Sequence, residues 1–172
     1  MRAPPMALAD AALLPPLVAE RPEDAAGVER LLLRAFGPGR FAKSAERLRE
    51  GRRPAYELSF VAWEDGEIVG CVQQWTVRVG ETPAILLGPF AVDPDFRSQG
   101  LGAALIEQAC TAATEAGHGL IILVGDMPYF GRLGFTPAAK AVMPGPVDQR
   151  RVLVRALKPD ADANPEGAVA AA

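Results

Sequence analysis

The feature that most constrains this fold is a junction in the middle of the chain, where an apolar run meets a loop with paired glycines. The run from Ala84 to Val92 is almost entirely apolar, which predicts a buried strand. Asp93-Pro94 ends this strand, because proline lacks a backbone N–H and restricts the residue before it. Beyond Gly100, apolar residues recur at helical spacing. The sequence therefore predicts a strand, a short loop and a helix in succession.

The loop at this junction has the chemistry of an anion-binding site. The first N–H groups of a helix lack intrahelical partners, and the macrodipole places about half a positive charge there. Gly100 and Gly102 allow a phosphate to approach these groups, and Arg97 adds a permanent cation. A Walker loop would need Lys-Ser/Thr after Gly102, and a Rossmann fingerprint would need Gly or Ala in place of Leu105. A nucleotide-binding protein is thus a disfavoured alternative.

Two motifs in the chain resemble those of the GNAT N-acetyltransferases. Arg97-x-x-Gly100-x-Gly102 resembles the family's loop for the acyl-CoA pyrophosphate, and Tyr129 to Phe135 (Tyr-Phe-Gly-Arg-Leu-Gly-Phe) resembles a later block. One predicted helix and one predicted strand separate them, as in the family. The resemblance covers roughly Leu17 to Leu157. It implies an α/β fold of GNAT type: a mixed twisted sheet of six to seven strands, about four flanking helices and a splayed central strand pair.

Hydrophobic periodicity and turn residues predict the other elements. Asp65-Gly66 is the strongest hairpin signal in the sequence. Residues 1–15 are interpreted as a flexible leader, 16–158 as the acetyltransferase domain and 159–172 as a disordered tail rich in Ala, Asp, Pro and Gly. The predicted strands are 17–19, 56–64, 67–79, 83–92, 120–124 and 152–157, and the predicted helices outside the two motifs are about 23–35 and 43–50.

Composition excludes several function classes. The net charge of −3 provides no basic field for nucleic acid or an anionic membrane surface. No stretch approaches the roughly 20 apolar residues that span a bilayer, and the N-terminus lacks the features of a signal peptide. Cys71 and Cys110 have no metal-ligand spacing, so they are read as reduced core residues, which suggests a cytoplasmic location. The cluster Arg47, Arg49, Arg52 and Arg53 is read as a solvated helix face, with an anion contact as the alternative.

The resemblance implies acetyl-CoA as co-substrate and no metal. In the family a strand bulges away from its neighbour, and the pantetheine arm of CoA pairs with its exposed backbone. Gly88-Pro89 fits this feature, since proline cannot donate to a sheet ladder. Backbone N–H groups nearby would polarise the thioester carbonyl. The implied CoA-binding residues are Phe90, Ala91 and Val92 on the strand, and Arg97, Ser98, Gln99, Gly100, Leu101 and Gly102 in the loop.

The general acid is where the sequence departs from the family. The usual tyrosine stands four residues before the glycine of the Gly-Phe pair, and that position here is Phe130. Tyr129, one residue earlier, is the expected donor of a proton to the thiolate, with a packing role as its alternative. Because a thiol pKa is about 8.5, thiolate leaves without a donor, and we expect a slower enzyme and not an inactive one.

A free amine must also lose a proton before or during attack. Asp126 is the nearest candidate for the base, and capping of the following helix is its competing role. Glu57 and Glu81 are weaker candidates. In the family the early helices flank the acceptor site, so Phe36, Arg40 and Phe41 are also candidate substrate contacts, and Trp63 or Trp75 could line the pocket instead of the core.

The sequence therefore predicts an N-acetyltransferase that moves an acetyl group from acetyl-CoA directly to a primary amine. The acceptor is a small molecule or a peptide amine, and a homodimer is left open. The alternative from a different class is a non-catalytic acyl-CoA-binding or sensor module of the same fold. The phenylalanine at position 130, which has no proton to donate, is compatible with this alternative.

Overall fold

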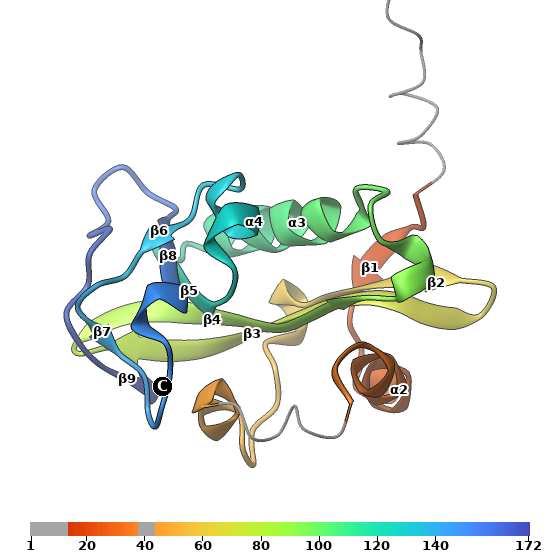
Figure 1. Ribbon diagram of the computed structural model, residues 1–172, viewed down its shortest axis with the longest axis horizontal. Helices are drawn as coiled ribbons and strands as arrows, with labels where there is room; N and C mark the ends of the chain where they lie inside the picture. The colour runs from red at the N-terminus through yellow and green to blue at the C-terminus, as the bar shows by residue number, and fades with distance from the viewer. Residues whose placement is uncertain (1–13, 38–43) are drawn as a thin grey trace, which may run out of the picture.

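The computed structural model describes residues 14–37 and 44–172, which form a mixed sheet with helices on both faces (Figure 1). Seven strands follow the order β1-β2-β3-β4-β5-β8-β6, and β9 pairs with both β3 and β7. The predicted α/β fold with a mixed sheet is confirmed. The strand count is higher than predicted, at nine, because short segments near the C-terminus without a clear strand pattern join the sheet through their backbones.

The bounds of the elements agree closely with the predicted hydrophobic pattern. The strands are β1 (Leu17–Ala19), β2 (Phe60–Glu64), β3 (Glu67–Val79), β4 (Thr82–Val92), β5 (Leu120–Val124), β6 (Thr136–Pro137), β7 (Ala141–Val142), β8 (Val152–Ala156) and β9 (Gly167–Ala171). The α-helices are α2 (Ala25–Phe36), α3 (Leu101–Glu115) and α4 (Met127–Gly131). Single 3₁₀ turns are η1 (Pro22–Asp24), η3 (Ser44–Leu48), η4 (Tyr56–Leu58), η5 (Pro94–Phe96) and η6 (Gln149–Arg151).

The β2–β3 hairpin turns where the sequence predicted it. Asp65 and Gly66 have φ values of 51° and 76°, the left-handed pair that a two-residue hairpin turn requires. From there β3 continues into β4 through a second tight turn, with nine paired positions from Gly70↔Val92 to Val79↔Thr82. This antiparallel meander carries the chain directly to the predicted anion-binding loop.

The two faces of the sheet are covered by different helices. Figure 1 shows α3 and α4 above the sheet and α2 below it. The buried face of α3 includes Leu101, Leu105 and Ile106, which pack with β2, β3 and β4. A Cβ at Gly70 of β3 would lie 2.8 Å from Leu105 Cδ1, so the glycine permits the close packing of α3 on the sheet. Helix α2 buries Val28, Leu31 and Leu32 against the opposite face.

Three local predictions need correction. The helix predicted at about 43–50 is only the 3₁₀ turn η3, within the residues that the structure describes. Tyr56–Leu58 is a 3₁₀ turn and not the start of a strand. In the segment predicted to be a disordered tail, Gly167–Ala171 forms β9.

The strand β9 forms because β3 offers it a free edge. Val169, Ala170 and Ala171 pair with β3 at Val79, Arg78 and Val77. Arg52 Nη2 then donates to the carbonyl oxygen of Ala172 over 3.0 Å. Backbone pairing of this kind leaves little trace in side-chain composition, which is why the Ala-rich sequence gave no strand signal. The predicted leader falls mostly on residues 1–13, which lie outside the described part of the chain.

Among the described residues, no helix has the length and apolar character needed to cross a bilayer.

Candidate active site

The strands β4 and β5 diverge in the middle of the sheet. Their parallel pairing is limited to Ile85↔Ile121 and Leu86↔Ile122, whereas the pairing of β4 with β3 continues to Val92. This confirms the predicted splayed strand pair. Pro89 lacks an N–H for a ladder, and the register between β3 and β4 shifts opposite it. We call the opening between β4 and β5 beyond Leu86 the gap.

The gap leaves one edge of β4 without a partner strand. Trp75 Nε1 donates to the carbonyl oxygen of Gly88 over 2.6 Å and so satisfies that acceptor from the β3 side. The backbone from Phe90 to Val92 then continues past the end of the β4–β5 ladder. An extended group of the right length can hydrogen-bond to such an edge as an added strand would.

The loop that follows β4, which the sequence predicts to bind an anion, leads into the start of α3, and we call residues 97–102 the cradle. Gly100 is the N-cap residue with φ 88° and ψ 0°, a left-handed conformation that glycine adopts without penalty. The first intrahelical bond runs from the Ala104 N–H to the Gly100 carbonyl, so the N–H groups of Leu101, Gly102 and Ala103 have no intrahelical acceptor.

The polar side chains of the loop are exposed around this helix start. Arg97 Nε donates to the Val92 carbonyl over 3.3 Å, which holds the guanidinium beside the end of β4. Gln99 Nε2 donates to the Asp95 carbonyl over 3.3 Å. Ser98 has a positive φ of 67° and turns the chain just before Gly100. The cation and the free N–H groups thus face the same exposed corner, as a phosphate site requires.

Gly102 has a packing role that the sequence reasoning missed. A Cβ at this position would lie 2.7 Å from the Tyr129 hydroxyl oxygen and 3.1 Å from Phe90 Cζ. The glycine of the motif therefore lets the aromatic residues of β4 and α4 approach the first turn of α3. Packing against these aromatic side chains alone would therefore require a glycine at position 102.

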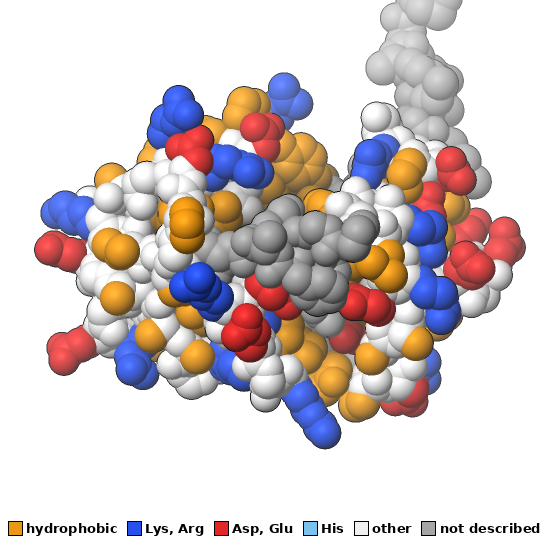
Figure 2. Space-filling view, turned by 60° about the horizontal axis from the view of Figure 1, so that its bottom comes forward, with side chains coloured by type: hydrophobic (Ala, Val, Ile, Leu, Met, Phe, Trp, Pro, Cys, Tyr) orange, Lys and Arg blue, Asp and Glu red, His pale blue; other side chains and the backbone are white. Residues whose placement is uncertain are grey.

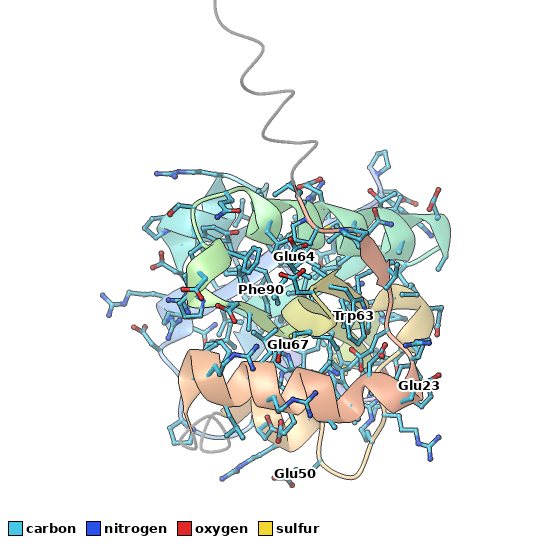
Figure 3. All side chains as sticks on the ribbon, turned by 90° about the vertical axis from the view of Figure 1, so that its right-hand side faces the viewer. Glu23, Glu50, Trp63, Glu64, Glu67 and Phe90 are labelled. Atoms are coloured by element: carbon cyan, nitrogen blue, oxygen red, sulfur yellow. The ribbon has the colours of Figure 1, made fainter. Side chains whose placement is uncertain are left out.

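These aromatic side chains form one cluster beside the gap. The ring centroids are 6.2 Å apart for Phe90 and Tyr129, 6.0 Å for Phe90 and Phe130, and 5.0 Å for Tyr129 and Phe130. Phe135 extends the cluster, 5.7 Å from Phe130. In Figure 3, Phe90 lies above α2, toward the α3 side of the molecule. The Phe90–Tyr129 pair is stacked and the other three pairs are edge-to-face, and these contacts fix the ring orientations at the opening.

The cluster places the two predicted acid positions differently. Phe130 is 7% exposed and lines the gap. Tyr129 is 36% exposed, and its hydroxyl lies at the first turn of α3 beside Gly102. Partial burial raises the pKa of the Tyr129 hydroxyl, so this group stays protonated at neutral pH.

Two cavities meet at the gap on the α2 side of the sheet, the face toward which Figure 2 is turned. The gap cavity, about 400 Å³, is lined by residues of β4, β5, α4 and the segment before β8, together with Phe36 and η3. The α2 cavity, about 540 Å³, lies between α2, η3, η4, β3 and the end of β1. Both are lined by Glu46, Arg49 and Pro89, so they adjoin at one wall.

Several predicted contacts can now be placed. Asp126 is exposed, lines the gap cavity and occupies the N-cap position of α4, where its side chain makes no capping hydrogen bond. Glu57 and Glu81 line neither cavity. Phe36 lines the gap cavity and Trp75 the α2 cavity, whereas Trp63 packs beside α2. Arg40 and Phe41 lie outside the described residues.

Sequence reasoning assigned Arg49 to a solvated face, and this is wrong. Arg49 is 9% exposed, pairs with Glu46 over 3.1 Å and lies close to the opening, with Nη1 3.5 Å from where a Cβ on Gly88 would stand. A charged residue in an irregular turn gives no periodic signal of burial. Only the contact of η3 with the sheet places this arginine inside.

Glu20 was not singled out by sequence reasoning at all. It follows β1, is 4% exposed and lines the α2 cavity. Gln73 Nε2 donates to both carboxylate oxygens, over 3.0 Å and 2.9 Å. Burial raises the pKa of the Glu20 carboxyl from 4.5 to about 7, opposed by the Gln73 hydrogen bond and assisted by nearby Asp24. No local motif marks such a residue, because its environment comes from distant strands.

The described residues contain no group of three or more His, Cys, Asp or Glu side chains that could hold a metal ion. Arrangements that resemble a metal-dependent hydrolase or a zinc site are therefore not seen in this part of the chain.

A splayed parallel strand pair, a glycine-containing loop at the start of a helix and an adjoining cavity are the arrangement expected of a GNAT-type acyltransferase. The model of the Acetyltransferase (GNAT) family matches residues 25–135. The chain is 35% identical over 123 residues to the uncharacterized N-acetyltransferase YhbS of Escherichia coli K12, covering 70% of this chain and 72% of the relative. The chain belongs to the GNAT acetyltransferase family, which confirms the predicted acetyl-CoA-dependent N-acetyltransferase at the level of the family.

Solved structures agree with this assignment. The crystal structure of E. coli YhbS in complex with CoA superposes with a TM-score of 0.79 at 28% identity, covering 93% of this chain and 91% of that one. A GNAT acetyltransferase from Brucella melitensis in complex with acetyl-CoA has a TM-score of 0.68 at 28% identity, covering 90% and 94%. Both comparisons cover at least 90% of this chain, so most of the fold is shared with these two structures.

The buried carboxyl of Glu20 predicts a pH-dependent stability. A carboxyl with a pKa raised from 4.5 to about 7 favours the folded state when protonated and opposes it when ionised, so its penalty grows as the pH rises from about 4.5 to about 7 and is complete above that range. Glu20→Gln removes the ionisation. We expect the variant to exceed the native protein in free energy of unfolding by up to about 3 kcal/mol at pH 8, and by little at pH 4.

Urea denaturation at both pH values measures this difference. Glu23→Gln is the matched control, since the Glu23 side chain is 65% exposed and lies on η1, just before α2 (Figure 3). An equal change for Glu20→Gln at pH 4 and pH 8 would contradict the assignment of a raised pKa.

Proposed function

We propose that this protein transfers the acetyl group of acetyl-CoA directly to a primary amine on a small molecule or peptide. The observation that supports this most is the end of the β4–β5 ladder at Leu86↔Ile122, on the same strand that leads into the cradle at α3. One strand thus offers a free backbone edge and, a few residues later, an anion site. An acyl-CoA needs both, for its pantetheine arm and its pyrophosphate.

In this proposal the cradle holds the pyrophosphate. Arg97 supplies the cation, Ser98, Gln99 and Gly100 form the loop, and the N–H groups at Leu101 and Gly102 face the phosphate oxygens. Relatives crystallised with CoA and with acetyl-CoA share the fold and support this assignment.

The pantetheine arm lies in the gap along β4. Backbone N–H groups of the segment Phe90, Ala91 and Val92 polarise the thioester carbonyl and stabilise the negative charge that develops on its oxygen. Such donors are already oriented by the β3–β4 ladder, so no rearrangement is needed as charge develops. The amine approaches from the α2 side, where the two cavities open onto the same point.

Two side chains are proposed to move protons. Asp126, exposed in the gap cavity, accepts a proton from the amine, which has a pKa of about 10.4 and must lose one to become acylated. Tyr129, protonated at neutral pH, gives a proton to the departing thiolate, directly or through water, from beside Gly102. The nitrogen–carbon bond forms, the carbon–sulfur bond breaks, and CoA leaves as the thiol.

A specific observation also favours a second candidate, a non-catalytic acyl-CoA-binding module. The residue that lines the gap at the usual tyrosine position is Phe130, which has no proton to donate. Turnover separates the two candidates.

The test of the proposed function is CoA release from acetyl-CoA with a panel of primary amines, including alkylamines, diamines, amino acid amides and a short peptide. We expect saturable turnover with at least one amine, and a loss of about 100-fold or more in kcat/KM for Asp126→Asn. Binding of acetyl-CoA without turnover of any amine would favour the non-catalytic module.

The cradle predicts a selective loss of CoA affinity when Gly100 is replaced by asparagine. Asparagine tolerates a left-handed backbone, and a Cβ at Gly100 meets open space, so the fold is retained while a side chain enters the phosphate site. Gly117→Asn is the matched control, because Gly117 has φ 91° and equally open surroundings at the other end of α3. We expect at least a tenfold rise in the Kd of CoA for Gly100→Asn only, measured by calorimetry.

The absence of a hydroxyl group on the side chain of residue 130 predicts that adding one increases activity. Phe130→Tyr places a hydroxyl beside the gap, so kcat rises by about 10-fold or more with little change in the KM for acetyl-CoA, since a donor to the thiolate acts only in the transition state. Tyr129→Phe lowers kcat if the neighbouring hydroxyl is the donor. If kcat is unchanged in both variants, protonation of the thiolate comes from water.

A further inference from the structure

The α2 cavity is larger than the gap cavity, and the chemistry proposed above does not use it. Its volume is about 540 Å³, against 400 Å³ for the gap cavity. Pro89, at the opening of the gap, stands in the walls of both. A molecule whose reacting amine reaches the gap from the α2 side therefore has space for a second part of its structure in the α2 cavity.

The inner end of this cavity carries a carboxylate held in place by the sheet. Gln73 lies on β3 within the register shift between Val72 and Gln74, across from the Gly88–Pro89 segment of β4. Its amide donates to both oxygens of Glu20. Since Gln73 belongs to the strand beside β4, Glu20 is positioned by the same irregularity that opens the gap. The Glu20 carboxylate is thus linked to β3 through the Gln73 side chain.

The walls around this carboxylate suit an organic cation. Trp75 and Tyr56 supply aromatic surface, and Val28 and Leu32 of α2 supply apolar surface for a carbon chain. The acidic groups near Glu20 are Asp24 on η1, Glu29 on α2 and Glu46 on η3, and the basic groups on the wall are Arg49, Arg52 and Arg53.

Two of these arginines are directed toward other partners. Arg49 pairs with Glu46 over 3.1 Å. Arg52 donates to the carbonyl oxygens of Leu48, Thr76 and Ala172. Asp24 is engaged by Arg21 over 3.1 Å. Glu20, by contrast, is held by the neutral amide of Gln73. Arg53 is an exposed cation on the same wall.

An ionised carboxylate in this position is expensive for the fold. Burial raises the pKa of Glu20 to about 7, so the empty cavity leaves the carboxyl partly protonated at neutral pH. A neutral glutamine would avoid that penalty. Retention of a destabilising acid at a cavity wall is typical of a functional site.

We propose that the α2 cavity is a specificity subsite in which Glu20 binds a second, cationic amino group of the acceptor. Resting on the proposed amine acetylation, this inference names the acceptor class: a flexible diamine or polyamine, or a chain ending in an equivalent cation. One amine reaches the thioester at the gap, the other pairs with Glu20, and the linking carbons cross the apolar wall. Glu20 is a binding residue here and takes no part in the chemical step.

The subsite is tested with matched amines. The series runs from 1,3-diaminopropane to 1,8-diaminooctane, and each diamine is compared with the alkylamine of the same carbon number. For the native protein we expect a best diamine with a kcat/KM at least 10-fold above its alkylamine. Glu20→Gln should reduce this ratio to near unity by raising the KM of the diamine, while the alkylamine and the Kd of CoA change little. Glu23→Gln should behave as the native protein.

A pH series separates this role from a structural one. The preference for the diamine should increase as the pH rises through 7, since the ionised carboxylate binds the cation, and should be flat in Glu20→Gln. Gln73→Leu removes the hydrogen bond that lowers the Glu20 pKa and should move this midpoint to higher pH. A structural effect of either substitution would alter stability without moving the midpoint.

The outcomes also distinguish the subsite from the proposed function. Acetylation of alkylamines as efficiently as of every diamine in the series would overturn the subsite and leave the N-acetyltransferase assignment standing. A preference for diamines that persists in Glu20→Gln, or that does not depend on pH, would also overturn it. Failure to acetylate any primary amine in the panel would overturn both.

Discussion

The parting of β4 from β5 is the constraint on which the rest of this site depends. Two parallel pairs, Ile85↔Ile121 and Leu86↔Ile122, hold the strands together, and then the ladder stops. A buried strand edge without hydrogen-bond partners is unfavourable in a closed core, so the opening must be filled or exposed. Here it opens into cavities on the α2 side, and an aromatic cluster borders it near α4 and α3. The fold keeps an unpaired backbone edge where a ligand can complete it.

The surroundings stabilise this opening from three directions. Trp75 hydrogen-bonds the Gly88 carbonyl from β3, and Phe130 packs against Phe90 and Phe135 beside the gap. Arg49 lies over Gly88 from the turn that follows η3. Each contact joins segments that are far apart in sequence. The consequence is a preorganised cleft: the donors on β4 are already oriented by the β3–β4 ladder, which is the condition under which backbone N–H groups stabilise developing charge most effectively.

The loop at the start of α3 and the cavity beside α2 are built in different ways. The loop at α3 offers backbone N–H groups and the Arg97 cation, whereas the α2 cavity is lined by side chains from α2, β3, irregular turns and the residue after β1. In the proposals above, the acyl-CoA is therefore bound through backbone conformation and the acceptor through side chains such as Glu20. The raised pKa of Glu20 shows that this second part is maintained at a cost to stability at alkaline pH.

The sequence by itself determined the strand-loop-helix junction and the hairpin at Asp65-Gly66, because each depends on local rules for proline, glycine and helix starts. The splay of β4 from β5 was implied by the family resemblance, which the Gly88-Pro89 pair fits. It also pointed to Phe130 as an unusual residue at the gap. Only the tertiary structure decided the burial of Glu20 and Arg49, the contact of the Tyr129 hydroxyl with Gly102, and the strand at Gly167–Ala171. Those features arise between segments distant in the chain, where burial and pairing are set by neighbours that no local pattern specifies.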